Sequence, residues 1–103
     1  MNFETISAKN LDAYIGRSDC MIIDLREEDE YRQGHIMSAY NVPYDRLERA
    51  FFRKDIIYIM YCERGSASLA AAKELAKKGY RVKSVVGGIR AYRGKYLTGV
   101  YGN

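Results

Sequence analysis

The sequence contains few of the residue types that hold metal ions. Its 103 residues include one histidine and two cysteines, and these cysteines, Cys20 and Cys62, form no C-x-x-C pair. A structural zinc site needs four such ligands, usually supplied as closely spaced pairs. We therefore expect no metal site and no cofactor.

Long apolar runs are also absent. No stretch approaches the roughly 20 apolar residues that a membrane-spanning helix requires, and the first residues lack the basic region and apolar run of a signal peptide. We therefore expect a cytoplasmic protein that does not enter a membrane. Because the cytosol keeps thiols reduced, a disulfide between Cys20 and Cys62 is not expected. Cys20, which opens the apolar run 20–23, is interpreted as a packing residue.

Positive charge is present but is not concentrated. The formal net charge is +4, and lysine and arginine are dispersed along the chain, whereas a nucleic-acid-binding protein shows a basic face or a stacking platform. We expect no nucleic-acid partner. The charge has two interpretations, mild attraction of anions or of an acidic partner surface and ordinary solubility, and we favour solubility.

Apolar runs alternate with helix-type patterns along the chain, which predicts one α/β domain over residues 1–103. We expect strands at 3–6, 21–25, 36–42, 56–61 and 82–86, and helices at 7–15, 27–32, 44–52 and 66–78. Strands and helices alternating in this way favour a central parallel sheet with helices on both faces. The helix at 44–52 is expected to place Leu47 and Phe51 on one face, and the helix at 66–78 to bury a stripe of Leu69, Ala72, Leu75 and Ala76.

Cys62 stands between the apolar strand 56–61 and the helix that starts near Ser66. A strand that ends in cysteine and turns through Gly65 into a helix directs backbone N–H groups inward, and the helix N-terminus adds partial positive charge. Such a field stabilises a thiolate and then any anionic sulfur attached to it. The alternative is that Cys62 is a small buried hydrophobe at a strand end, and the loop alone does not decide between the two.

Three separated motifs change that balance. Residues 24–26 read D-L-R, residues 30–43 read E-Y-R-Q-G-H-I-M-S-A-Y-N-V-P, and residues 85–88 read V-V-G-G. In this order around a strand, cysteine loop and helix, they closely resemble the rhodanese family of sulfurtransferases, with its D-x-R, E-[FY]-x-x-G-H-I-x-x-A-x-N-[VI]-P and V-x-G-G motifs. The resemblance covers about residues 3–92 and implies one rhodanese-like domain with a short C-terminal tail at 93–103.

The resemblance implies that Cys62 is the catalytic nucleophile of a sulfurtransferase. It would take a sulfur from thiosulfate or a persulfide, hold it as Cys–S–S⁻, and pass it to a thiol, to cyanide or to a protein acceptor. The loop that would bind the anionic substrate comprises Glu63, Arg64, Gly65, Ser66, Ala67 and Ser68, whose backbone amides would surround the outer sulfur. Ser66 has two interpretations, helix cap or hydroxyl donor, and we favour the cap.

The loop departs from the common family form at one place. The fifth position after the cysteine, often arginine in the family, is Ala67, while Arg64 is the only cation inside the loop. Arg64 is expected either to bind the anionic end of thiosulfate or to point to solvent, and Glu63 is expected to repel small dianions. These features predict weak use of thiosulfate and favour a persulfide on another protein or a small thiol as the donor.

Four polar residues upstream are interpreted as structural support. Arg26 and Glu30, four residues apart, are expected to pair, and Asp24 at a strand end is expected to accept backbone N–H bonds. His35 matches the histidine of the family's G-H-I motif and is expected to support the fold rather than to act as a base.

Two other functions compete with sulfur transfer. A cysteine phosphatase builds a related loop with arginine six positions after the cysteine, but that position is Ser68 here. A non-catalytic rhodanese-like module, which binds a partner or senses redox state through Cys62, differs only in whether a persulfide forms and turns over.

Overall fold

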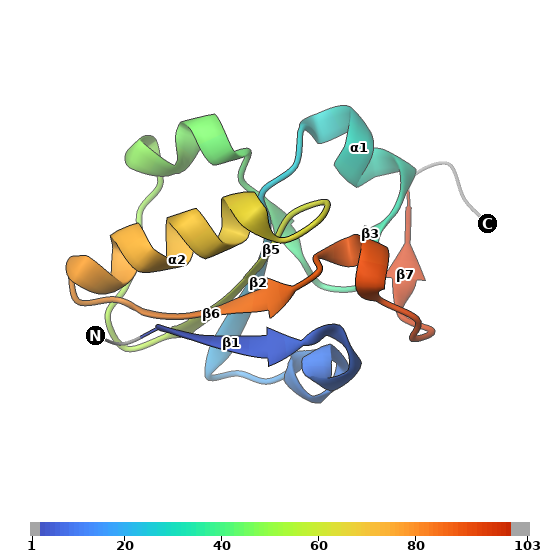
Figure 1. Cartoon of the computed structure of the whole chain (residues 1–103), viewed down its shortest axis with the longest axis horizontal. Coiled ribbons are helices and arrows are strands. Elements are labelled where there is room, and N and C mark those ends of the chain that lie inside the picture. The colour runs from blue at the N-terminus through green and yellow to red at the C-terminus, as the bar shows by residue number, and fades with distance from the viewer. Residues whose placement is uncertain (1–2, 100–103) are drawn as a thin grey trace.

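The computed structural model describes residues 3–99 and contains a central sheet of five parallel strands (Figure 1). The strands are β1 (Phe3–Ser7), β2 (Cys20–Asp24), β4 (Tyr40–Asn41), β5 (Ile57–Tyr61) and β6 (Arg81–Val86). Their spatial order is β1-β6-β5-β2-β4, and each neighbouring pair is parallel. The predicted α/β fold is confirmed.

Helices cover both faces of this sheet. They are η1 (Ala8–Tyr14), α1 (Glu28–Gln33), η2 (Tyr44–Arg49), α2 (Ser66–Lys77) and η3 (Ile89–Ala91), where η denotes a 3₁₀ helix. In Figure 1, α2 crosses one face and η1 lies beyond the other. The long helix predicted at 66–78 is present, whereas the helices predicted at 7–15 and 44–52 are shorter and 3₁₀ in form.

The central strand β5 explains why the sheet has two cores. All five of its residues are buried, and their side chains alternate between the faces. Ile57, Ile59 and Tyr61 pack with η1 residues on one side, while Tyr58 and Met60 pack with α2 on the other. An apolar strand without polar alternation requires cover on both faces, and this fold provides it.

The segment after η2 differs from the expectation for Phe51. The helix ends at Arg49, and Ala50 is extended at φ −79° and ψ 150°, so the helical spacing that joins Leu47 to Phe51 is lost. Phe52 turns into the core instead, against Tyr58, and Phe51 is 87% exposed.

The extended segment predicted at 36–42 is two short strands in different sheets. A turn with Ser38 at φ +74° separates β3 (His35–Ile36) from β4. Strand β3 pairs antiparallel with β7 (Leu97–Thr98), which lies inside the segment 93–103 that we expected to be a tail. Residues 100–103 of that segment lie outside the described residues. Within residues 3–99, no helix has the length and apolar character needed to cross a membrane.

The parallel register brings three loops to one edge of the sheet. Asp24 at the end of β2 lies beside Tyr61 at the end of β5, and β6 ends next to them. The chain therefore delivers Arg26, the Cys62 loop and the Gly87-Gly88 turn to the same edge, where parallel sheets bind ligands.

Tyr61 ties this edge to β3. Its side chain is fully buried, and its hydroxyl accepts the Ile36 N–H at 3.0 Å. Burial, with the nearby Asp24 carboxylate, raises the pKa of Tyr61, so the phenol stays protonated. One buried ring thus connects the central strand to the second sheet.

We predict that Tyr61→Phe lowers the free energy of unfolding by about 1–3 kcal/mol, because the buried Ile36 N–H loses its acceptor. Tyr40→Phe is the control, because Tyr40 is 59% exposed and surface changes usually stay within about 0.5 kcal/mol. Urea unfolding measures both variants. Equal stability of Tyr61→Phe and the parent chain would contradict the assigned hydrogen bond.

Candidate active site

Two backbone N–H groups point at the sulfur of Cys62. Residue Cys62 is 6% exposed, and its Sγ accepts the Gly65 N–H at 3.1 Å and the Ser68 N–H at 3.4 Å. Two of the amides expected to surround a bound sulfur therefore point at the Cys62 sulfur itself. Donors directed at a sulfur atom stabilise negative charge on it.

Further amides of the loop remain unused. The N–H groups of the first turn of a helix have no intrahelical acceptor, and those of Arg64, Ser66 and Ala67 donate to no atom of residues 3–99. An anionic atom attached to Cys62 would meet these donors together with the positive end of α2.

Ser68 closes the loop from behind. It is fully buried, its Oγ lies 3.7 Å from the Cys62 sulfur, and it donates to the Gly65 carbonyl at 3.2 Å. A second buried hydroxyl, that of Ser84 on β6, lies 2.9 Å from Ser68 Oγ and shares a hydrogen bond with it. Ser68 occupies the position that carries arginine in a cysteine phosphatase. Here its side chain supports the loop through buried hydrogen bonds.

The helix after the loop begins differently from the expectation for Ser66. Gly65 is the N-cap residue at φ +107°, and Ser66 is the first helical residue, with no capping hydrogen bond from a side chain. The cap assigned to Ser66 was wrong because the helix starts one residue earlier than that role requires. Ser66 is exposed instead and lines the pocket above Cys62.

The Gly87-Gly88 turn holds the other side of the loop. Ile89 N–H donates to the Cys62 carbonyl at 2.9 Å, and Arg90 N–H donates to the Glu63 carbonyl at 3.1 Å. Gly88 has φ +64°, and a Cβ there would lie 2.4 Å from the Cys62 carbonyl oxygen. Only glycine allows this approach of backbone to backbone.

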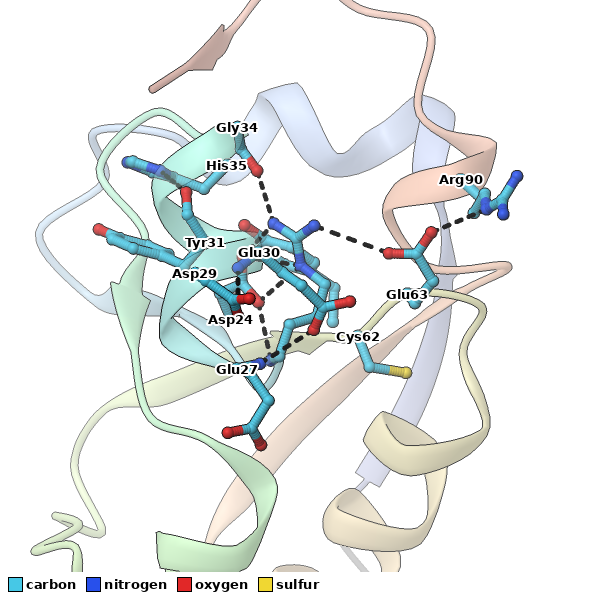
Figure 2. Close-up of polar contacts among 12 residues, drawn as sticks. Asp24, Glu27, Asp29, Glu30, Tyr31, Gly34, His35, Cys62, Glu63 and Arg90 are labelled. Carbon is cyan, nitrogen blue, oxygen red and sulfur yellow. Dashed lines mark hydrogen bonds and ion pairs between the residues drawn. The ribbon is translucent and has the colours of Figure 1, made fainter. Parts of the chain in front are cut away.

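Glu63 is held by two arginines. Its carboxylate lies 2.8 Å from Arg90 Nε and 3.7 Å from Arg26, and Figure 2 draws these contacts as dashed lines on either side of it. The repulsion of dianions assigned to Glu63 is therefore largely cancelled, because two cations share its charge. Through these contacts, Glu63 connects the start of the Cys62 loop to Arg26 and Arg90.

Arg26 pairs with Asp24 and not with Glu30. The Arg26 guanidinium donates to both Asp24 oxygens, at 2.7 Å for the shortest bond, and to the Gly34 carbonyl at 2.6 Å. The expected pairing with Glu30 was wrong because helix α1 starts at Glu28, so Arg26 lies outside it. Glu30 accepts the Glu27 N–H and completes a capping box.

Asp24 takes the role expected of it. Its carboxylate is fully buried and accepts the backbone N–H of Arg26 at 2.9 Å. A buried carboxylate requires such compensation.

His35 belongs to the support of α1. Its ring stacks on Tyr31 with 3.7 Å between centroids, and its Nδ1 lies 2.7 Å from the Tyr31 carbonyl. In Figure 2 the ring points away from the side of the site where Cys62 lies. A stacked imidazole already bound to backbone suits a structural role.

An open pocket of about 350 Å³ leads to Cys62. Its lining residues are Leu25, Arg26, Glu27, Glu30, Cys62, Glu63, Arg64, Ser66 and Ala67. Arg64 is exposed and makes no ion pair or hydrogen bond with residues 3–99, whereas Arg26 is already bound by Asp24. One uncommitted cation therefore faces the pocket, alongside the carboxylates of Glu27 and Glu30.

The second cysteine lies in a different environment. Cys20 is half-buried on β2, and its thiol donates to the Tyr14 carbonyl at 3.4 Å. Burial raises the pKa of the Cys20 thiol, which disfavours the thiolate there.

Reasoning from the sequence missed three residues of this site. Ser84 and Arg90 were assigned no role, and Gly88 was recognised only as part of the V-x-G-G motif that ends the strand at 82–86. The paired glycines were the available signal, since adjacent glycines often mark a close approach of two backbones. Among residues 3–99, no cluster of three potential metal ligands is present.

The chain matches the rhodanese-like domain over residues 7–95. It is 27% identical over 103 residues to the thiosulfate sulfurtransferase GlpE of Coxiella burnetii, an alignment that covers 95% of this chain and 94% of that protein. It is 32% identical over 81 residues to a putative mitochondrial thiosulfate sulfurtransferase of Schizosaccharomyces pombe, covering 64% of this chain and 57% of the longer relative.

A solved structure has the same fold. The rhodanese-like domain protein of Staphylococcus aureus superposes with a TM-score of 0.83 at 25% identity, covering 93% of this chain and 97% of that one. The similarity therefore extends over nearly the whole sheet and its helices.

We predict that Gly88→Ala slows alkylation of Cys62 at neutral pH by about tenfold or more, because its Cβ displaces the Cys62 and Glu63 carbonyls and with them the backbone donors of the loop. Gly16→Ala is the matched control, since Gly16 also has positive φ, +83°, but no atom lies within 4 Å of the added Cβ. Gly16→Ala should lose about 1–2 kcal/mol of stability through its positive φ, and Gly88→Ala should lose more because its Cβ also overlaps backbone atoms of Cys62 and Glu63. Equal alkylation rates in the two variants would show that the turn does not shape the loop.

Proposed function

This chain belongs to the rhodanese-like domain family, and we propose that it is a sulfurtransferase in which Cys62 carries the transferred sulfur. The observation that supports this best is the pair of backbone N–H groups, of Gly65 and Ser68, directed at the Cys62 sulfur. Distant relatives named thiosulfate sulfurtransferase agree with it.

The reaction has two displacement steps. In the first, the Cys62 thiolate attacks the outer sulfur of the donor, forming a Cys62 S–S bond, while the donor's own S–S bond breaks and its electron pair leaves with a thiolate or, from thiosulfate, with sulfite. In the second, an acceptor thiolate or cyanide attacks the outer sulfur and releases the Cys62 thiolate. No net oxidation or reduction occurs, and neither step needs a general base when the thiolate is already present.

The backbone amides supply the electrostatic part of this reaction. The negative outer sulfur of the intermediate would lie in the pocket over Cys62, within reach of the unused N–H groups of the loop and the N-terminus of α2. Fixed dipoles that face the developing charge stabilise it without reorganising.

The pocket favours a persulfide over thiosulfate as donor. A dianion entering it meets one uncommitted cation, Arg64, and the exposed carboxylates of Glu27 and Glu30. A persulfide carries a single negative charge at the reacting sulfur. The N–H groups of the loop can stabilise that charge by donating hydrogen bonds to the sulfur. We therefore propose a persulfide on a small thiol or a protein as the donor, with a thiol, protein thiol or cyanide as acceptor.

The competing functions have less support. Phosphate transfer lacks the gripping arginine, because Ser68 at that position is buried and bonded to Ser84. A non-catalytic module remains the second candidate, and turnover distinguishes it from an enzyme.

We predict that Cys62→Ser abolishes sulfur transfer to cyanide and that Cys20→Ala retains it, because Cys20 has its thiol pKa raised by burial. Thiocyanate formation measures transfer, and mass spectrometry of the parent chain after donor treatment should find one added sulfur on Cys62. Persulfide on Cys62 without turnover would favour the binding or redox-sensing module. Activity retained in Cys62→Ser would eliminate the mechanism.

A second prediction concerns the donor. Arg64→Ala should lower kcat/KM for thiosulfate roughly 10- to 150-fold. This corresponds to about 1.5–3 kcal/mol of lost transition-state stabilisation, the contribution of a charge-assisted hydrogen bond. A persulfide donor should be affected much less, and Ala67→Arg should raise the value for thiosulfate. An unchanged kcat/KM for thiosulfate in Arg64→Ala would remove Arg64 from the site.

A further inference from the structure

A second cavity lies away from Cys62, between η2 and α2. Its volume is about 330 Å³, and its lining residues are Tyr44, Asp45, Leu47, Glu48, Ala71, Glu74, Leu75 and Lys78. The floor is apolar, since Ala71 and Leu75 are buried in the core beneath it, and Tyr44 at its side is 45% exposed. We call this cavity the η2–α2 groove.

The rim of the η2–α2 groove is acidic although the chain as a whole is basic. Asp45, Glu48 and Glu74 contribute three carboxylates and Lys78 one ammonium, and Glu74 also pairs with Lys77 at 3.8 Å. One net negative charge therefore remains at the rim, while the formal net charge of the chain is +4. An apolar floor with an acidic rim fits an apolar side chain flanked by cations.

The same chain carries a segment of that description. Phe51 is 87% exposed, the most exposed of the large apolar side chains in residues 3–99. Arg49 precedes it, and Arg53 and Lys54 follow it. All three cations are exposed. Arg53 is bound by Asp55 at 2.6 Å, whereas Arg49 makes no ion pair within the described part of the chain. We call residues 49–54 the basic aromatic segment.

The groove and the basic aromatic segment adjoin one another. The segment follows directly from η2, which forms one wall of the groove, and Lys54 lies over the Tyr80 ring, 5.3 Å from its centroid, just beyond the end of α2. Figure 1 shows this stretch of chain descending beside the C-terminal end of α2. The two features are therefore neighbours on one surface.

We propose that this face is a homodimer interface in which Phe51 of each copy enters the η2–α2 groove of the other. The groove and Phe51 are close together on each copy. A two-fold axis can therefore place Phe51 of each copy in the groove of the other at the same time, and the assembly closes at two copies. Arg49 and Lys54 of one copy then face the acidic rim of the other, while Arg53 stays paired with Asp55.

The proposal is tested by sedimentation velocity of the full chain from about 1 μM to about 1 mM, the range in which weak complexes dissociate. The parent chain should dimerise within this range. Phe51→Ala should raise the dimer dissociation constant at least about tenfold, since each buried phenylalanine contributes that much or more. Met37→Ala is the control, because Met37 is an exposed apolar residue, at 45%, in another part of the fold, and it should leave the constant unchanged.

A charge exchange tests the orientation. Glu48→Lys/Glu74→Lys makes the rim basic, and Arg49→Glu/Lys54→Glu makes the segment acidic. Each double variant should be monomeric alone, since its groove and its basic aromatic segment then carry like charge. An equal mixture of the two variants should form heterodimers.

Adding Phe51→Ala to both members of the mixture should abolish those heterodimers, which separates this contact from general attraction between oppositely charged proteins. A parent chain that stays monomeric at the highest concentration overturns the proposal. So does a dimer that Phe51→Ala leaves intact, because another surface would then hold it. Far-ultraviolet circular dichroism identifies any variant that has lost the fold, and the exposed positions chosen are expected to retain it.

Discussion

The candidate site depends on one backbone contact, the packing of the Gly87-Gly88 turn against the first peptides of the Cys62 loop. Two hydrogen bonds fix the carbonyls of Cys62 and Glu63 to the chain after Gly88. In a trans peptide the N–H points opposite to the carbonyl, so the N–H groups of Glu63 and Arg64 are directed away from this turn. Further along the loop, the N–H groups of Gly65 and Ser68 donate to the Cys62 sulfur. The loop is thus shaped from outside by β6, which lies next to β5 in the sheet.

The other polar groups of the site extend this constraint. Ser84, on the same strand β6, braces the loop through Ser68, and Arg90, just after the turn, binds Glu63. On the opposite side, the buried Asp24–Arg26 pair links β2 to Gly34 and reaches Glu63. A buried ion pair contributes little net stability, but its fixed geometry here positions the loop between β2 and β6. In the proposed sulfurtransferase, the anion-binding groups would be main-chain amides held in place by these contacts, so that a loop with one cation could receive an anionic sulfur.

The sequence sufficed for the sheet, the long helix and the placement of Cys62, because these follow from apolar runs and from one strand-to-helix turn. It did not predict the exposure of Phe51 or the pairing of Arg26 with Asp24. Both errors came from applying helical spacing to residues outside a helix, since η2 ends at Arg49 and α1 begins at Glu28. Contacts such as Arg90 with Glu63 join positions 27 residues apart, and such pairing depends on the tertiary fold rather than on a local pattern. Helix boundaries one to three residues from their expected place thus decided which side chains meet.

Helix α2 relates the two surfaces of the molecule. Its first residues, Ser66 and Ala67, line the pocket over Cys62, whereas Ala71, Glu74, Leu75 and Lys78 line the η2–α2 groove. At 1.5 Å per residue, Leu75 lies about 13 Å along the axis from Ser66. Because the same helix directs its N-terminus at Cys62 and packs its C-terminal half beneath the groove, a dimer that orders η2 against α2 would also hold the helix that presents the anion-binding amides.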